Sequence, residues 1–258
     1  MRKIIDAHMH LPYHVEGLQN KKEHLLMQLE NYGITYGIVI SDSLLKSDIG
    51  SLTECVELFE DTDRVLVAGG ISPLIDYDNQ LRLLEKYIVE RKIVAIKLFC
   101  GHEKFYLNDC RLMSVYDIAA RYCVPIVFHS GWENAKYAEP DIVQKVSRQY
   151  GNINFICCHL NYPKVTECVQ ELRNCQNVYF DLSSIADDNS IAMKFCELLS
   201  QQIHEMPERF LFGSDYESCD IKEHIDFIDK LRISDIEKER IFYSNAKRLY
   251  RLDIMEDL

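Results

Sequence analysis

The chain repeats one local pattern eight times, a short apolar segment followed by a longer amphipathic one. The short segments are nearly continuous apolar runs, which is typical of parallel strands buried on both faces. The longer segments space their apolar residues three or four positions apart, as one face of a helix does. We predict strands at 3–7, 36–40, 65–71, 94–99, 123–129, 153–158, 178–182 and 210–213. We predict helices at 22–32, 52–59, 79–90, 111–122, 141–150, 163–173, 191–200, 222–231 and 235–249.

Strict alternation of strand and helix favours a parallel sheet. Eight such units in 258 residues fit a closed (β/α)8 TIM barrel better than a doubly wound sheet, because single barrels of about 250 residues are common. We therefore predict an α/β fold with one barrel domain over 1–258. No glycine-rich fingerprint follows the first predicted strand, so a dinucleotide site of that kind is not expected.

Charge and composition narrow the classes of partner. The chain has 29 basic and 41 acidic residues and a formal charge of −12, whereas nucleic-acid binding usually needs a basic face. We expect no nucleic-acid partner. No apolar run approaches the roughly 18 residues of a membrane span, and the first residues meet an acid before an export signal develops. We therefore expect no membrane partner and a cytoplasmic protein whose ten cysteines are mostly reduced core thiols.

Polar residues at the ends of the predicted strands are candidates for chemistry, because a barrel builds its active site where its strands end. His8 and His10 follow the first strand, and their i, i+2 spacing places both side chains on one face. His129, His159 and Asp215 end later strands. Two imidazoles, with His129 and Asp215, can hold a divalent metal and leave one position open for water. This donor set suits zinc, iron, cobalt or manganese.

Five segments resemble one known family. The segments are IDAHMH at 5–10, VPIVFHSG at 124–131, CHL at 158–160, FLFGSDY at 210–216 and SNAKRLY at 244–250. The chain resembles the amidohydrolase superfamily, in its amidohydrolase-2-like branch of TIM-barrel metal-dependent hydrolases, over almost its whole length. The resemblance implies that His8, His10, His129 and Asp215 bind the metal. It also implies that His159 holds a second metal or polarises the substrate.

The activity that this resemblance implies is hydrolysis of a small molecule. Metal-activated water would attack the carbonyl of an amide, ester or lactone, since bound water reaches a pKa of about 7 against 15.7 in bulk. Asp215 would act as general base, and His159 or the metal would stabilise the oxyanion. A homo-oligomer is compatible with the sequence.

Lys97 leaves the number of metal ions open. In binuclear branches of the superfamily a lysine on the fourth strand is carbamylated and bridges two ions, and Lys97 lies near the end of that predicted strand. The same stretch also occurs in the mononuclear branch. We favour a single ion, with zinc preferred, and Lys97 as a charge on the substrate side. Further substrate contacts are expected from His102, Trp132 and Tyr216, which follow the fourth, fifth and eighth strands.

Three other functions are compatible with the same residues. The first is non-hydrolytic decarboxylation of a small carboxylic acid, for which Lys97, Lys104 and Arg111 are the candidate anchors. The second is a phosphodiesterase of the metal-dependent deoxyribonuclease branch, which usually has a glutamate on the fourth strand, whereas 94–99 contains no acid. The third is a barrel that binds a metal or metabolite without catalysis. The predicted loops are short, so we expect an open pocket.

Overall fold

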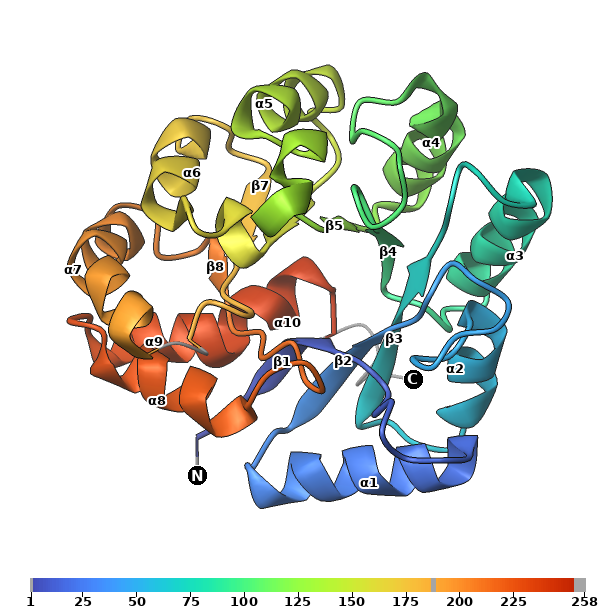
Figure 1. The fold of residues 1–258 in the computed structure, drawn as a ribbon, viewed down its shortest axis with the longest axis horizontal. Helices are drawn as coiled ribbons and strands as arrows, with labels where there is room; N and C mark the ends of the chain where they lie inside the picture. Colours follow the sequence, from blue (N-terminus) through green and yellow to red (C-terminus); the bar gives the residue numbers. More distant parts are fainter. Residues whose placement is uncertain (1, 187–188, 253–258) are drawn as a thin grey trace.

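A ring of eight parallel strands lies inside a ring of helices in the computed structural model, which describes residues 2–186 and 189–252 (Figure 1). Each strand pairs with the next along the chain, in the order β1 to β8. The strands are β1 (Ile5–Met9), β2 (Tyr36–Ile40), β3 (Val65–Gly70), β4 (Ala95–Leu98), β5 (Ile126–Phe128), β6 (Phe155–Cys158), β7 (Val178–Asp181) and β8 (Phe210–Leu211). The eight predicted strands are confirmed, with shorter ends in most cases.

The two ends of the strand ring meet between β8 and β1. The Ala7 amide donates to the Phe212 carbonyl (2.9 Å), and the Asp215 amide donates to the His8 carbonyl (2.8 Å). The buried carboxylate of Asp6 accepts from the amides of His8 (3.1 Å) and Ser214 (3.0 Å). These bonds join the first strand to the turn after the last one, and the predicted single-domain TIM barrel is confirmed.

The helices agree with the predicted segments apart from several boundaries: α1 begins four residues early, at Leu18, and α7 ends five residues late, at Glu205. The expected helix from 163 begins at Val165, and the expected helix over 235–249 contains a π-helical turn, η4, between α9 and α10. The helices are α1 (Leu18–Asn31), α2 (Leu52–Leu58), α3 (Tyr77–Val89), α4 (Met113–Tyr122), α5 (Pro140–Gln149), α6 (Val165–Leu172), α7 (Asn189–Glu205), α8 (Ile221–Lys230), α9 (Asp235–Glu239) and α10 (Asn245–Leu249). Short 3-10 turns are η1 (Cys110–Leu112), η2 (Trp132–Tyr137) and η3 (His159–Asn161), and η4 covers Arg240–Ser244.

Alternation along each strand separates an outer core from the barrel interior. The outer core packs the strands against the helices, while Ile5, Ala95 and Ile156 belong to a second apolar cluster in the interior. Tyr250 and Leu249 of the C-terminal region join that second cluster at the N-terminal end of the barrel. The interior is thus apolar and closed at one end, which leaves the opposite end for polar side chains.

The last inward-facing positions of several strands are polar. Lys97 follows Ala95 by two residues, Cys158 follows Ile156 by two, and Asp181 follows Tyr179 by two. His129 continues the same pattern just beyond β5. The C-terminal end of the barrel therefore contains the chemistry-bearing groups. No helix within 2–186 or 189–252 is long and apolar enough to cross a membrane.

Candidate active site

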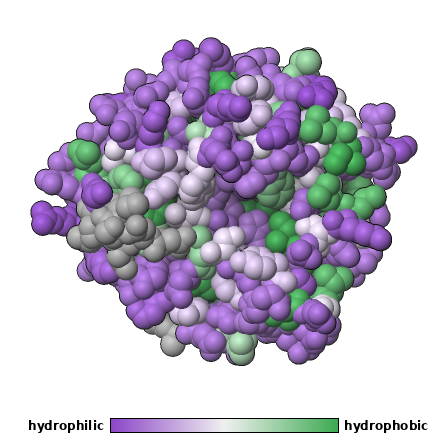
Figure 2. Space-filling view, viewed as in Figure 1, coloured by the Kyte–Doolittle hydropathy of each residue, from purple (hydrophilic) through white to green (hydrophobic). Residues whose placement is uncertain are grey.

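A cavity of about 700 Å³ opens at the C-terminal end of the strands. In Figure 2 the view is onto this end, and hydrophobic surface gathers on the side of the loops that follow β2 and β3. The exposed side chains there include Leu44, Leu45, Leu74 and Ile75. All but one of the predicted site residues line the cavity: His8, His10, Lys97, His102, His129, Trp132, His159 and Asp215.

Tyr216 is the exception. It lines a smaller cavity of about 370 Å³ together with His14 and Glu217, and Ser218 and Cys219 line both this cavity and the larger one. The chain turns at Asp215, whose φ of 62° lies in the left-handed region. Tyr216 does not line the larger cavity, and its expected contact with substrate stays a prediction.

The two ring nitrogens of His8 have different surroundings: the protein hydrogen-bonds Nδ1, and Nε2 faces Asp215. Its Nδ1 lies 2.6 Å from Oδ2 of Asp181 and 3.1 Å from Oγ of Ser183, all buried. Because the carboxylate accepts a proton there, Nδ1 is the protonated nitrogen and Nε2 presents its lone pair. That Nε2 lies 3.3 Å from Oδ1 of Asp215.

His10, two residues after His8, also has Nδ1 bound to the protein and Nε2 near Asp215. Its Nδ1 donates to the backbone carbonyl of Ile40 (3.2 Å), and its Nε2 also lies 3.3 Å from Oδ1 of Asp215. The second carboxylate oxygen of Asp215 accepts from the hydroxyl of Ser184. Ligand atoms of His8, His10 and Asp215 all lie within 4.8 Å of one another. Outer partners that fix the free nitrogen of each imidazole are a common feature of protein metal sites.

His129 faces the same cavity from the other side. It is 7% exposed, and its Nε2 is buried without a hydrogen-bond partner in the described part of the chain. Its ring centroid lies 5.0 Å from that of His159 and 4.1 Å from that of His102. His129 does not belong to the set formed by His8, His10 and Asp215, whose ligand atoms lie within 4.8 Å of one another. A buried imidazole nitrogen without a partner costs free energy unless a ligand occupies it, so the donor set fits a metal ion bound by His8, His10 and Asp215 near His129.

Burial sets the protonation of these groups. It lowers the pKa of His8 and His129 and lowers that of His159 to about 3, so the three imidazoles are neutral, the form that binds metals. Burial alone would raise the pKa of Asp215, but His8 and His10 hold it well below its usual range. Asp215 is therefore a carboxylate at neutral pH.

Comparison with known proteins identifies the family. The model of the amidohydrolase family matches residues 5–252. The chain belongs to the amidohydrolase family. This is a family of enzymes, so the chain belongs to an enzyme family. No curated protein matches the sequence.

Solved structures share the fold of this amidohydrolase-family chain at low identity. An uncharacterized TIM-barrel protein from Bordetella bronchiseptica is 18% identical, with a TM-score of 0.76 over 96% of this chain and 98% of that one. A 4-oxalomesaconate hydratase from Rhodopseudomonas palustris is 17% identical, with a TM-score of 0.72 over 98% of each chain. A dihydroxybenzoic acid decarboxylase from a Polaromonas species, which contains bound manganese, is 13% identical, with a TM-score of 0.70 over 100% of this chain and 98% of that one. These identities show a shared fold alone.

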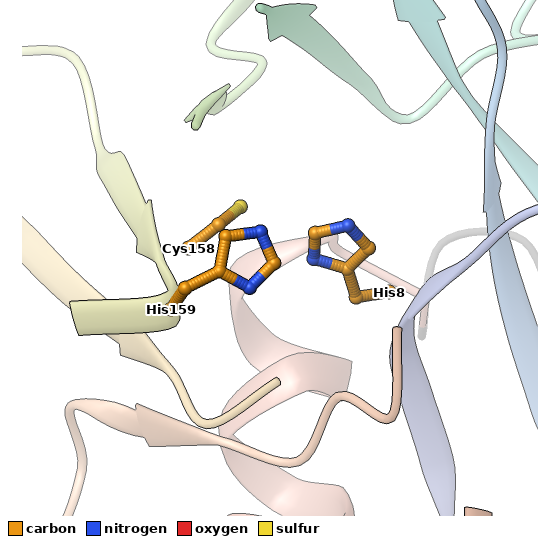
Figure 3. Close-up of side chains that lie close together, drawn as sticks. All are labelled: His8, Cys158 and His159. Carbon is orange, nitrogen blue, oxygen red and sulfur yellow. The ribbon is translucent and has the colours of Figure 1, made fainter. Parts of the chain in front are cut away.

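Cys158 belongs to the site of this amidohydrolase-family chain, although we expected most cysteines to be plain core thiols. Figure 3 shows its side chain beside His159 and facing His8. Its sulfur accepts a hydrogen bond from Nζ of Lys97 at 3.3 Å. Burial raises the pKa of Cys158 well above its usual value, so it is a neutral thiol. Six of the ten cysteines are buried, as expected for most of them, while Cys110 and Cys123 are exposed.

Sequence reasoning missed two residues that position the histidines. Asp181 binds His8, and the hydroxyl of Ser183 lies between Nδ1 of His8 and Nδ1 of His159, 2.9 Å from the latter. The available signal was an acid at the end of the predicted strand 178–182. Gly213 is part of the same arrangement, because a Cβ there would lie 2.2 Å from Oδ1 of Asp181.

Proposed function

We propose that this chain is a metal-dependent hydrolase in which water attacks the carbonyl carbon of an amide, ester or lactone in a small molecule and the acyl C–N or C–O bond breaks. The observation that carries the proposal is the convergence of Nε2 of His8 and Nε2 of His10 on one oxygen of Asp215, inside the cavity. These three residues, with the free Nε2 of His129 nearby, would hold one divalent ion, for which we favour zinc. When bound, such an ion acts as a Lewis acid and makes water a nucleophile at neutral pH.

The residues of the chain supply the proton transfers and the orientation. Asp215 is ionised and has one oxygen fixed by Ser184, so it can accept a proton from attacking water and return it to the leaving group. The hydroxyl of Ser183 forms a hydrogen bond with Nδ1 of His159. This bond fixes the orientation of the neutral His159 ring in the cavity. We assign His159 to orienting the carbonyl oxygen of the substrate.

The mouth of the cavity suits an apolar part of the substrate. Trp132 is 43% exposed there and lies against the rings of His159 and Tyr162, at centroid distances of 5.2 and 5.1 Å. His102 lies beside it against His129. Stacking and apolar contact with such rings bind flat or aliphatic groups without requiring charge.

Decarboxylation of a small acid is the second candidate, because several solved structures of the same fold are decarboxylases. An acid substrate needs cationic anchors, and Lys97 is the sole lysine or arginine among the described residues that line the cavity. Arg111 instead binds Asp109 through two hydrogen bonds of 2.9 and 2.6 Å. Asp42, Glu103 and Glu133 line the cavity as well, which disfavours an anionic substrate and favours hydrolysis.

The test combines metal analysis with a reaction panel. Protein purified without chelators should contain about one metal equivalent per chain and should hydrolyse members of a panel of amides, esters, lactones and phosphoesters. An Asp215→Asn variant serves as the control for contaminating hydrolases. Release of CO₂ from a panel of small acids, without hydrolysis, would replace this function with decarboxylation. Metal binding without either reaction would indicate a non-catalytic barrel.

A further inference from the structure

Lys97 is a buried cation with almost no protein partner. It lies in β4 facing the barrel interior, is 1% exposed and lines the cavity. Within the described residues its ammonium makes one hydrogen bond, to the thiol sulfur of Cys158, and no ion pair. The ring of Phe99 lies 5.3 Å from Nζ. An ammonium offers three donors, and a thiol sulfur is a weak acceptor.

The other buried lysines of the chain show that this is not a general pattern. Lys21 donates to the backbone carbonyls of Pro12 (2.7 Å) and Asp48 (2.6 Å). Lys22 forms an ion pair with Asp61. A buried cation without such partners lowers the folding free energy that the protein gains. The N–H groups of Lys97 that Cys158 does not use can therefore donate to a ligand in the cavity.

The position of Lys97 is close to the reacting groups. Its sulfur partner, Cys158, has its ligand atom within 4.8 Å of those of His8 and His159. Its positive charge contributes, after burial, to the lowered pKa of His8. The remaining charged side chains of the cavity wall are acidic, among them Asp42 and Glu103. A negatively charged oxygen inside the cavity would thus be attracted by Lys97 and repelled by the acidic side chains.

We infer that Lys97 is a catalytic residue that donates a hydrogen bond to the carbonyl oxygen of the substrate once attack by water has made that oxygen an oxyanion. This inference rests on the proposed hydrolase function. As the oxygen of water bonds to the carbonyl carbon, the π pair moves to the carbonyl oxygen and Asp215 takes the proton of the water. Lys97 stabilises the resulting oxyanion and stays protonated. The pair then re-forms the carbonyl, the bond to nitrogen or oxygen breaks, and Asp215 protonates the leaving group.

A stabilising contact made to a charge that exists only after attack should act on kcat rather than on KM. Lys97→Met removes the charge and keeps an unbranched apolar chain in a buried position. We expect kcat for the best substrate of the panel to fall about 100- to 1,000-fold, as on removal of one oxyanion donor, with KM changed less than about threefold. The matched control is Lys145→Met, since Lys145 is exposed on α5 and does not line the cavity.

A binding measurement gives a readout without turnover. Metal-loaded wild-type protein and both variants are titrated by calorimetry with phenylphosphonate, a tetrahedral anion, and with benzamide, its neutral counterpart. We expect Lys97→Met to weaken phenylphosphonate binding about tenfold or more, as for a charge-assisted hydrogen bond, and to leave benzamide binding within about twofold. If Lys97→Met does not fold by circular dichroism, Lys97→Gln, which keeps a donor toward Cys158, replaces it.

Unchanged kcat and unchanged phosphonate affinity in Lys97→Met would overturn the inference. A rise in KM alone would also overturn it, because Lys97 would then bind a ground-state group. Two metal equivalents with CO₂ bound covalently to Lys97 would overturn it as well, since the ammonium would be absent. Loss of phosphonate binding in a protein that hydrolyses nothing would support the anion contact of Lys97 while refuting the hydrolase function.

Discussion

The two sides of the cavity hold their histidines in different ways. On the side of β1, His8 and His10 each have Nδ1 bound to the protein and Nε2 directed at Asp215. On the side of β4 and β5, His129 has a buried Nε2 without a described partner, and Lys97 has a thiol alone. The β1 side is organised by the protein itself. The β4–β5 side has polar groups whose partners must come from the cavity, as a bound ion, substrate or water.

The largest expected effect concerns the residue on which the β1 side converges. Asp215→Asn removes the proton acceptor and one anionic ligand, so turnover should fall by about a thousandfold or more. Circular dichroism should show a retained fold, because the main-chain bond from the Asp215 amide to His8 persists. Substrate turnover within tenfold of wild type would show that the β1 side is not the reacting side.

Next in size is the effect of the outer partner of His8. Asp181→Asn should reduce metal affinity roughly 10- to 100-fold, because loss of such a partner weakens orientation and basicity of the ligand. Competition with a chromogenic chelator measures the affinity. Asp63→Asn, an exposed change, is the control. Equal affinities in the two variants would mean that Asp181 does not position His8.

A smaller effect is expected from packing alone. Gly213→Ala would place a Cβ 2.2 Å from Oδ1 of Asp181, and relief of that overlap should lower the free energy of unfolding by about 1–3 kcal/mol. Gly151→Ala is matched to it, since the nearest atom to its added Cβ is 4.0 Å away. Urea denaturation compares them, and similar losses in both would contradict the close approach at Gly213.

The smallest expected effect has opposite signs on the two sides. In metal-free protein, His129→Leu should raise the free energy of unfolding by about 1 kcal/mol, because it removes a buried nitrogen without a partner. His8→Leu should lower it, because Asp181 would lose its buried partner. Thermal unfolding in a chelator measures both. Metal should then stabilise the wild type more than His129→Leu, and equal shifts would exclude His129 as a ligand.

The sequence was sufficient for the fold and for much of the site because both depend on local patterns. Apolar runs marked the eight strands, and polar residues at strand ends marked His8, His10, His159 and Asp215. Asp181 was missed because its role depends on how β7 lies beside the end of β1 in the closed ring, which no local pattern encodes. Tyr216 lines the neighbouring, smaller cavity, a placement that depends on the course of the chain after β8 and that no local pattern encodes.

The closure between β1 and the turn after β8 also has a consequence for the order in which the site can assemble. His8 and Asp215 are separated by most of the chain and are neighbours only when the ring is complete. A nascent chain that has not yet reached residue 215 carries two imidazoles and lacks their carboxylate. Contacts between residues so far apart in the sequence form late in folding. A bound ion would need ligands from both ends of the chain, so its binding free energy would favour the closed barrel.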